Sequence, residues 1–156
     1  MGYQDSARFG KRSEFIVIAE LLRLGFDVYL TLVDDKAIDC VIRLNNQQYV
    51  DVQIKARNQD GINWNKFGPL SIEPRQNYIY IFYTEFNKIY WVIPSIELVT
   101  LCSDGKTGKH QGKMALRLPR IDIGDKAEQY KRYRNNFSLI EELVGKGVID
   151  SDISTI

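Results

Sequence analysis

The segment that most constrains the fold of this 156-residue chain runs from Val50 to Lys55. Apolar and polar side chains alternate along it: Val50, Val52 and Ile54 are apolar, whereas Asp51, Gln53 and Lys55 are polar. Successive side chains of a β-strand point to opposite faces, so the segment predicts a strand with one apolar and one polar face. The apolar face requires a covering layer of helices, while the polar face is either solvated surface or an assembled site.

The remaining pattern predicts an α/β (α+β) fold with a central mixed β-sheet flanked by helices. Apolar residues at helical spacing predict a helix over 13–24 that ends at Gly25, and an earlier start with Asp5 as N-cap is an alternative. Asn45-Asn46 is expected to form a hairpin turn, and residues 57–77 and 103–112 are expected to be irregular. The other predicted elements are strands over 26–32, 37–44, 48–56, 78–83, 88–93 and 116–118, and helices over 95–101 and 126–144.

Length and composition predict one globular domain spanning residues 1–156. Hydrophobic residues make up 44% of the chain, yet no apolar run approaches the length of a membrane span, and the N-terminus does not read as a signal peptide. Cys40 and Cys102 lack metal-ligand spacing, and Cys40 is expected to be a reduced core residue of a cytoplasmic protein. With a net charge of +1, a nucleic-acid surface requires segregation of charge.

Asp39 interrupts a predicted strand that is otherwise almost wholly apolar, fourteen positions before Gln53. A buried carboxylate needs an ion or a hydrogen-bond network to compensate for its lost hydration. Mg²⁺ prefers oxygen ligands, which the Asp39 carboxylate and the Gln53 carbonyl would supply. Lys55 would then orient a water molecule or stabilise charge on phosphorus. The alternatives are a solvated strand-end aspartate and an ordinary solvated strand face.

These residues resemble the PD-(D/E)XK nuclease superfamily. The resemblance implies a restriction-endonuclease-like core, in which a helix precedes a three-stranded mixed meander. It also implies that Glu14, Asp39 and Gln53 bind Mg²⁺ (or Mn²⁺), and that Lys55 assists the nucleophilic water. The members most similar to this chain are small Holliday-junction resolvases, homing endonucleases and bacterial proteins of unassigned role. The matching segments are residues 10–14, 21–26, 38–39 and 53–57.

Two positions depart from the superfamily pattern. Ile38 replaces the proline that precedes the first acidic residue, which changes the local backbone but leaves the ligand in place. Gln53 replaces the second acidic residue and so removes a negative charge from the site. Weaker metal binding is therefore expected unless Glu14 or Asp51 contributes a carboxylate.

Four further side chains are candidate contacts to nucleic acid: Arg12, Arg57, Trp64 and Lys66. The cations would meet phosphates, and Trp64 would stack on a base, although a loop tryptophan more often pins its loop to the core. The aromatic residues between 78 and 91 are best explained by sheet packing. The loop containing Lys106, Lys109, His110 and Lys113 is expected to be exposed and basic, and residues 130–134 form either a DNA contact or a dimer surface.

The sequence thus predicts a metal-dependent endonuclease that hydrolyses phosphodiester bonds in double-stranded or branched DNA. One alternative is a module of the same fold that binds nucleic acid or protein without cleavage, because Gln53 weakens the metal site. A second is an interaction protein whose aromatic sheet and tyrosine-rich helix form an interface. The resemblance further implies a homodimer or higher homo-oligomer, since small nucleases commonly pair to reach both DNA strands.

Overall fold

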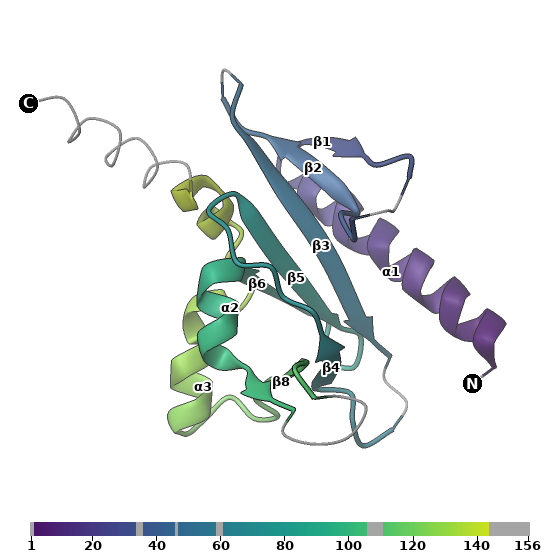
Figure 1. The fold of residues 1–156 in the computed structure, drawn as a ribbon, viewed down its shortest axis with the longest axis vertical. Helices are drawn as coiled ribbons and strands as arrows, with labels where there is room; N and C mark the ends of the chain where they lie inside the picture. The colour runs from purple at the N-terminus through teal and green to yellow at the C-terminus, as the bar shows by residue number, and fades with distance from the viewer. Residues whose placement is uncertain (1, 34–35, 46, 59–60, 106–110, 144–156) are drawn as a thin grey trace, which may run out of the picture.

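The fold is organised around a five-stranded mixed β-sheet with the strand order β1-β2-β3-β5-β6 (Figure 1). The structure is a computed structural model that describes residues 2–33, 36–45, 47–58, 61–105 and 111–143. β3 and β5 are parallel, whereas the other neighbouring strands of this sheet are antiparallel. The predicted α+β class with a central mixed sheet is therefore confirmed. The strands are β1 (Asp27–Leu30), β2 (Cys40–Arg43), β3 (Tyr49–Arg57), β5 (Tyr78–Thr84) and β6 (Ile89–Pro94).

One side of the sheet is covered by α1 (Tyr3–Arg23), which lies alongside β3 (Figure 1). Its buried side chains Val17, Ile18 and Leu21 recur at helical spacing and form one apolar stripe. The helix begins at Tyr3 rather than at residue 13, with Gly2 as its N-cap. The prediction of Asp5 as the cap was wrong: Asp5 lies within the first turn, where a carboxylate is favoured by the helix dipole.

The next helices along the chain gather near the β6 end of the sheet, away from α1 (Figure 1). α2 (Ser95–Leu101) starts directly after β6 and has its predicted range. It is followed later in the chain by α3 (Asp125–Tyr130) and the 3₁₀ turn η2 (Lys131–Tyr133). α2 packs on β5 and β6, and η2 packs on β6, so these elements cover the half of the sheet that contains the last two strands.

The prediction of one helix over 126–144 was wrong, because the chain leaves helical geometry after η2. Arg134 forms an isolated β-bridge with Trp91, and Asn135 has a positive φ of 50°. The Asn135 amide donates to the Tyr90 carbonyl over 2.6 Å, and the Tyr90 amide donates to Asn135 Oδ1 over 2.9 Å. Asparagine tolerates this backbone conformation better than most residues. A further helix covers 138–143, and residue 144 lies outside the described residues.

A second, three-stranded antiparallel sheet lies beyond the end of β3 and has the order β4-β8-β7. Its strands are β4 (Lys66–Leu70), β7 (Ser103–Asp104) and β8 (Met114–Arg117). The expectation of an irregular segment over 57–77 was wrong for β4, and the expected edge strand near residue 116 is instead the middle strand of this sheet. Phe67 and Leu116 face each other and are buried, and the Phe67 ring packs edge-on against Phe82 at 4.9 Å. This contact joins the small sheet to β5.

Every residue of β5 is buried, which makes this strand the centre of the core. The rings of Tyr78 and Tyr80 lie 4.9 Å apart, and those of Tyr80 and Phe82 lie 6.1 Å apart. The expectation that the aromatic run serves sheet packing is thus confirmed for these residues. Cys40 is also fully buried and not in a disulfide, as expected.

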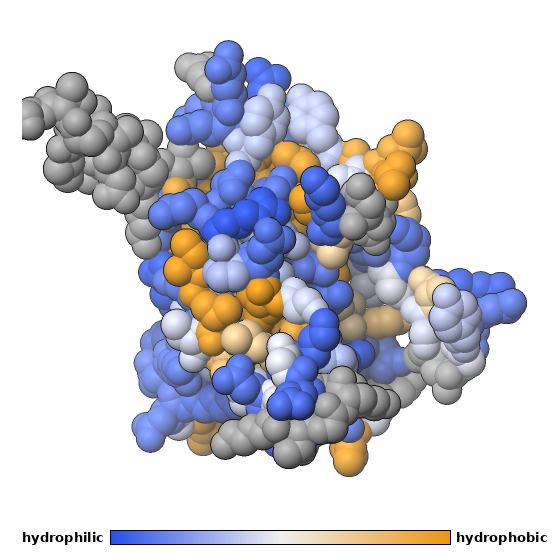
Figure 2. Space-filling view, viewed as in Figure 1, coloured by the Kyte–Doolittle hydropathy of each residue, from blue (hydrophilic) through white to orange (hydrophobic). Residues whose placement is uncertain are grey.

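The surface seen in Figure 2 is mainly hydrophilic, with an apolar patch over the region of α2. No helix in the described part of the chain has the length and apolar character that a membrane crossing requires. Two sequence predictions fall outside the described residues: the turn at Asn46, and the basic loop through Lys106, Lys109 and His110.

Replacement of Leu21 by alanine is expected to lower the free energy of unfolding by about 2–5 kcal/mol, because Leu21 is fully buried under the sheet and leaves a cavity. Leu22→Ala is the matched control, since Leu22 is 54% exposed on the same helix turn. Urea unfolding followed by circular dichroism measures both. Equal losses in the two variants would contradict the placement of α1 on the sheet.

Candidate active site

Gln53 lies in the middle of β3 and is buried, with 7% of its surface exposed. Its side-chain Oε1 accepts a hydrogen bond of 3.0 Å from the hydroxyl of Tyr78, which begins the parallel neighbour β5. Asp51 and Lys55, on the same face of β3, are half-buried. The polar face of this strand is therefore not a solvated surface, and the amide is held by a specific partner.

Asp39 immediately precedes β2, and its carboxylate lies against the backbone of β3. Oδ2 accepts a hydrogen bond of 2.6 Å from the Ile54 amide, and the Asp39 amide donates to the Val52 carbonyl over 2.9 Å. Ile54 lies between Gln53 and Lys55 in the strand, so Asp39 is adjacent to both. The structure thus brings together three of the four predicted catalytic positions.

Glu14 lies on α1, the helix that packs on β3. Its Oε2 accepts a hydrogen bond of 2.5 Å from Lys11 Nζ, one turn earlier in the helix. Burial raises the pKa of the Cys40 thiol to about 12, and the negative charges of Asp39 and Glu14 add to this effect. Both carboxylates therefore act on the same thiol, although Glu14 is already engaged by a lysine.

A chain of contacts behind Gln53 was not predicted from the sequence. Arg75 forms an ion pair of 2.6 Å with Asp51, and its guanidinium lies 4.2 Å from the centre of the Tyr78 ring. The backbone of Arg75 is fixed in turn, because its amide donates to Ser95 Oγ over 3.0 Å and its carbonyl accepts from that hydroxyl over 2.8 Å. Asp51 pairs with this arginine, which disfavours the expected contribution of Asp51 to metal binding.

Tyr78 and Arg75 could not be assigned to the site from sequence, because their place depends on the parallel pairing of β3 with β5. Burial raises the pKa of Tyr78 strongly. Its interaction with Tyr80 raises this pKa further, and the negative charge of Asp39 adds a smaller rise. The Tyr78 hydroxyl therefore stays protonated at neutral pH and remains a hydrogen-bond donor to Gln53.

The donor chemistry of the site fits a hard cation such as Mg²⁺ or Mn²⁺. Asp39 and Glu14 carry carboxylate oxygens, and the Gln53 side-chain carbonyl oxygen has a second lone pair beyond the one that Tyr78 uses. The described residues contain no cluster of three or more His, Cys, Asp or Glu side chains that would hold a metal ion. Any site at this position thus depends on the Gln53 amide as well as on carboxylates.

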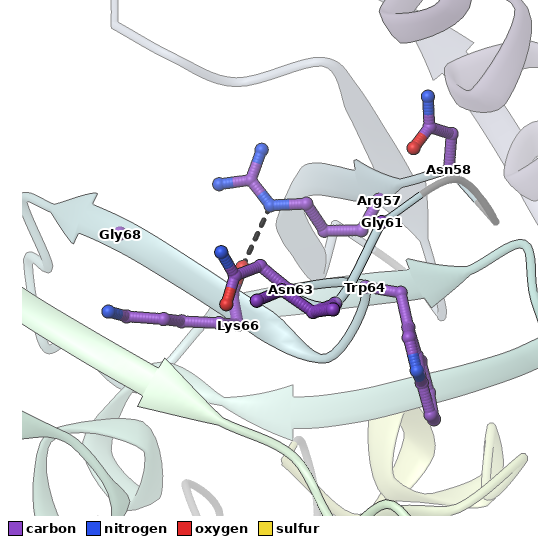
Figure 3. Close-up of a pocket in the computed structure, with 8 residues that line it drawn as sticks. Arg57, Asn58, Gly61, Asn63, Trp64, Lys66 and Gly68 are labelled. Carbon is purple, nitrogen blue, oxygen red and sulfur yellow. Dashed lines mark hydrogen bonds between the residues drawn. The ribbon is translucent and has the colours of Figure 1, made fainter.

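Three of the four candidate nucleic-acid contacts line one surface hollow of about 570 Å³: Arg57, Trp64 and Lys66 (Figure 3). The Trp64 ring stacks on Phe86 at 4.8 Å with an interplanar angle of 26°, so it pins the loop to the β5–β6 connection. Arg12 lies on α1 and forms an ion pair of 2.6 Å with Glu85. The Glu85 amide donates to the Arg57 carbonyl, which places Arg12 near the same end of β3.

No protein-family model matches this chain, and no curated protein matches it. Among solved structures, the chain is similar to a bacterial homing endonuclease, I-Ssp6803I, with a TM-score of 0.65. The match covers 93% of this chain and 95% of that chain at 18% sequence identity. Agreement over almost the whole of both chains shows that this protein has a nuclease-like fold.

Replacement of Tyr78 by phenylalanine is expected to lower the free energy of unfolding by about 1–3 kcal/mol, because the buried Gln53 carbonyl loses its donor. Tyr49→Phe is the control, since Tyr49 is half-exposed at the start of β3. If the hydrogen bond is the cause, Tyr78→Phe should cost less in a Gln53→Leu background, where the carbonyl is absent. Urea titration of the four variants measures this, and an equal cost in both backgrounds would contradict it.

Proposed function

We propose that this protein is a metal-dependent endonuclease that hydrolyses phosphodiester bonds in DNA, with Asp39, Gln53, Lys55 and Glu14 as its site. The observation that supports this most is the contact between the Asp39 carboxylate and the Ile54 amide. It holds a carboxylate beside a lysine and an amide oxygen on one rigid strand. The similarity in fold to a homing endonuclease adds support for the reaction class.

In the proposed mechanism, Asp39, Gln53 and Glu14 would hold Mg²⁺ or Mn²⁺, which when bound supplies Lewis acidity toward the scissile phosphate and a water molecule. Lys55 is half-buried on β3, two residues from Gln53. Its ammonium would hydrogen-bond to the attacking water or to a non-bridging phosphate oxygen. Water attacks phosphorus as the bond to the leaving sugar oxygen breaks. Tyr78 fixes the orientation of the Gln53 amide.

DNA would reach this site along the end of β3, where Arg57, Trp64 and Lys66 line the hollow and Arg12 lies nearby. The cations would contact phosphates, while Trp64 would shape the loop through its contact with Phe86. We further propose that residues 1–156 act as one domain. A homo-oligomer, which would present two sites to the two strands, completes this proposal.

The decisive assay incubates the protein with supercoiled and with branched DNA in the presence of Mg²⁺ or Mn²⁺. Cleavage by the parent is expected, with a loss of about a hundredfold or more in Lys55→Ala because transition-state charge loses its donor. Arg23→Ala, which removes an exposed cation at the end of α1, should retain parental activity. No cleavage by the parent, or equal cleavage by Lys55→Ala, would overturn the catalytic proposal.

Replacement of Gln53 by glutamate is expected to tighten Mg²⁺ or Mn²⁺ binding by about tenfold or more, because it restores a negative charge beside Asp39. Isothermal titration calorimetry measures the affinity in the absence of DNA. Gln48→Glu adds the same charge just before β3 and should leave metal affinity unchanged. If both variants respond equally, the effect is one of net charge and Gln53 is not a ligand.

A second candidate function is a module of the same fold that binds nucleic acid or a protein without cleaving it. Two observations favour it: Gln53 Oε1 is already hydrogen-bonded to Tyr78, and Glu14 is already paired with Lys11. Both would reduce metal affinity. Calorimetry that gives no heat with Mg²⁺ or Mn²⁺, together with DNA binding that persists, would select this candidate.

A further inference from the structure

The small sheet β4-β8-β7 carries two cations directly opposite each other, Lys66 on β4 and Arg117 on β8. Both side chains are exposed, and directly opposed residues of an antiparallel pair project from the same face. Like charges in this arrangement destabilise a sheet. Within the described part of the chain, neither side chain forms an ion pair. In the free protein, the positive charges of Lys66 and Arg117 therefore repel each other, and no carboxylate of the described residues pairs with either of them.

Further positive charge lies on both sides of this pair. Arg57 Nε donates a hydrogen bond of 2.8 Å to the Lys66 carbonyl, so its guanidinium lies at the start of β4. In Figure 3 the side chains of Arg57 and Lys66 extend in the same direction, away from Trp64. On the β8 side, burial lowers the pKa of Lys126, and the charge of Arg117 adds to this effect. Positive charge is thus concentrated here in a chain of net charge +1.

The surface around the pair is hollowed and has little side-chain bulk. Two hollows share Lys66 and Gly68: the one that contains Arg57, and a second one over β4, β7 and β8. Ala115 lines the second hollow, and a Cβ on Gly68 would lie 3.2 Å from the Cβ of Ala115. These small residues lie beside the cation pair, two positions away along each strand, and let a ligand approach the strand backbone there. Asp104, which carries a carboxylate, also lines the second hollow.

We propose that Lys66 and Arg117 form a binding site for a backbone phosphate of double-stranded DNA, next to the phosphodiester bond to be cleaved. A phosphate between the two side chains would remove their repulsion, and guanidinium and ammonium donors both suit its oxygens. An antiparallel β-ribbon fits the major groove of a duplex. Arg57 follows Lys55 by two residues on β3 and touches the first residue of β4, so this site adjoins the candidate active site. The inference rests on the proposed function.

The test measures affinity for a short duplex and for its single strand in metal-free buffer, over salt from about 50 to 200 mM. Loss of one phosphate contact reduces the slope of log affinity against log salt by about 0.9, so the Lys66→Gln, Arg117→Gln double variant, which loses the one phosphate held by both side chains, should lose about 0.9 on the duplex. Its affinity deficit should therefore shrink about threefold to fourfold across this salt range. Arg43→Gln is the matched control and should keep the parental slope. Arg43 ends β2 and pairs with Tyr49 at the start of β3, far along that strand from Arg57.

Charge reversal separates recognition from folding. Arg117→Glu would face Lys66 with an opposite charge, so the free protein should melt at a higher temperature than the parent while its duplex affinity falls. If Arg117→Glu weakens binding and also lowers stability, the variant has a folding defect. The salt slope of the double variant on the duplex then decides whether the site binds phosphate. An unchanged duplex slope in the double variant, or a loss confined to the single strand, would overturn the proposed site.

The outcomes also distinguish this inference from the proposed function. Duplex binding with the expected slope loss, but no cleavage with Mg²⁺ or Mn²⁺, would leave the phosphate site intact and remove the catalytic proposal. Cleavage that depends on Lys55, with no effect of Lys66 or Arg117 on the duplex slope, would support the catalytic proposal and overturn the phosphate site. Absence of duplex binding by the parent at low salt would overturn the phosphate site.

Discussion

The parallel pairing of β3 with β5 is the constraint on which the rest of the structure depends. It places β3 inside the sheet, so that both edges of this strand are paired with a neighbouring strand. It brings Tyr78 beside Asp51 in register and within hydrogen-bonding distance of Gln53. A parallel connection also needs a long crossover, and this crossover contains β4. The candidate site and the small basic sheet both follow from this one pairing.

Burial of the polar face of β3 explains how a neutral amide can stand where the resemblance leads one to expect a carboxylate. A second carboxylate beside Asp39 would be costly in the absence of a bound cation, because two like charges would share a partly buried site. The Gln53 amide avoids this cost, and the Tyr78 hydroxyl satisfies its carbonyl. The Asp51–Arg75 pair likewise neutralises the next carboxylate along the strand. Asp39, Gln53 and Asp51 thus each have a partner within the protein.

The sequence predicted the elements whose patterns are local, and these include most of the central sheet. Alternation in 50–55 and the apolar repeat of α1 depend only on neighbouring residues, so β3 and the body of α1 were identified. What could not be predicted depends on contacts between distant segments. β4 is short and includes Gly68 and Pro69, and it forms only because β8 pairs with it from more than forty residues away. The break at Asn135 likewise depends on Tyr90. For the same reason, Arg75 and Arg117 carried no sequence signal.

The distribution of ion pairs makes the surface charge of this nearly neutral chain uneven. Arg12, Arg75 and Arg132 are each neutralised by a carboxylate from a distant part of the sequence, namely Glu85, Asp51 and Glu97. Tertiary ion pairs of this kind remove positive charge from α1, from the crossover and from the turn after α3. The cations that face each other across β4 and β8 lack such partners among the described residues, so their positive charge is not compensated by an ion pair. A fold that carries uncompensated like charges loses some stability, which is the kind of local cost found where a protein must bind a charged ligand.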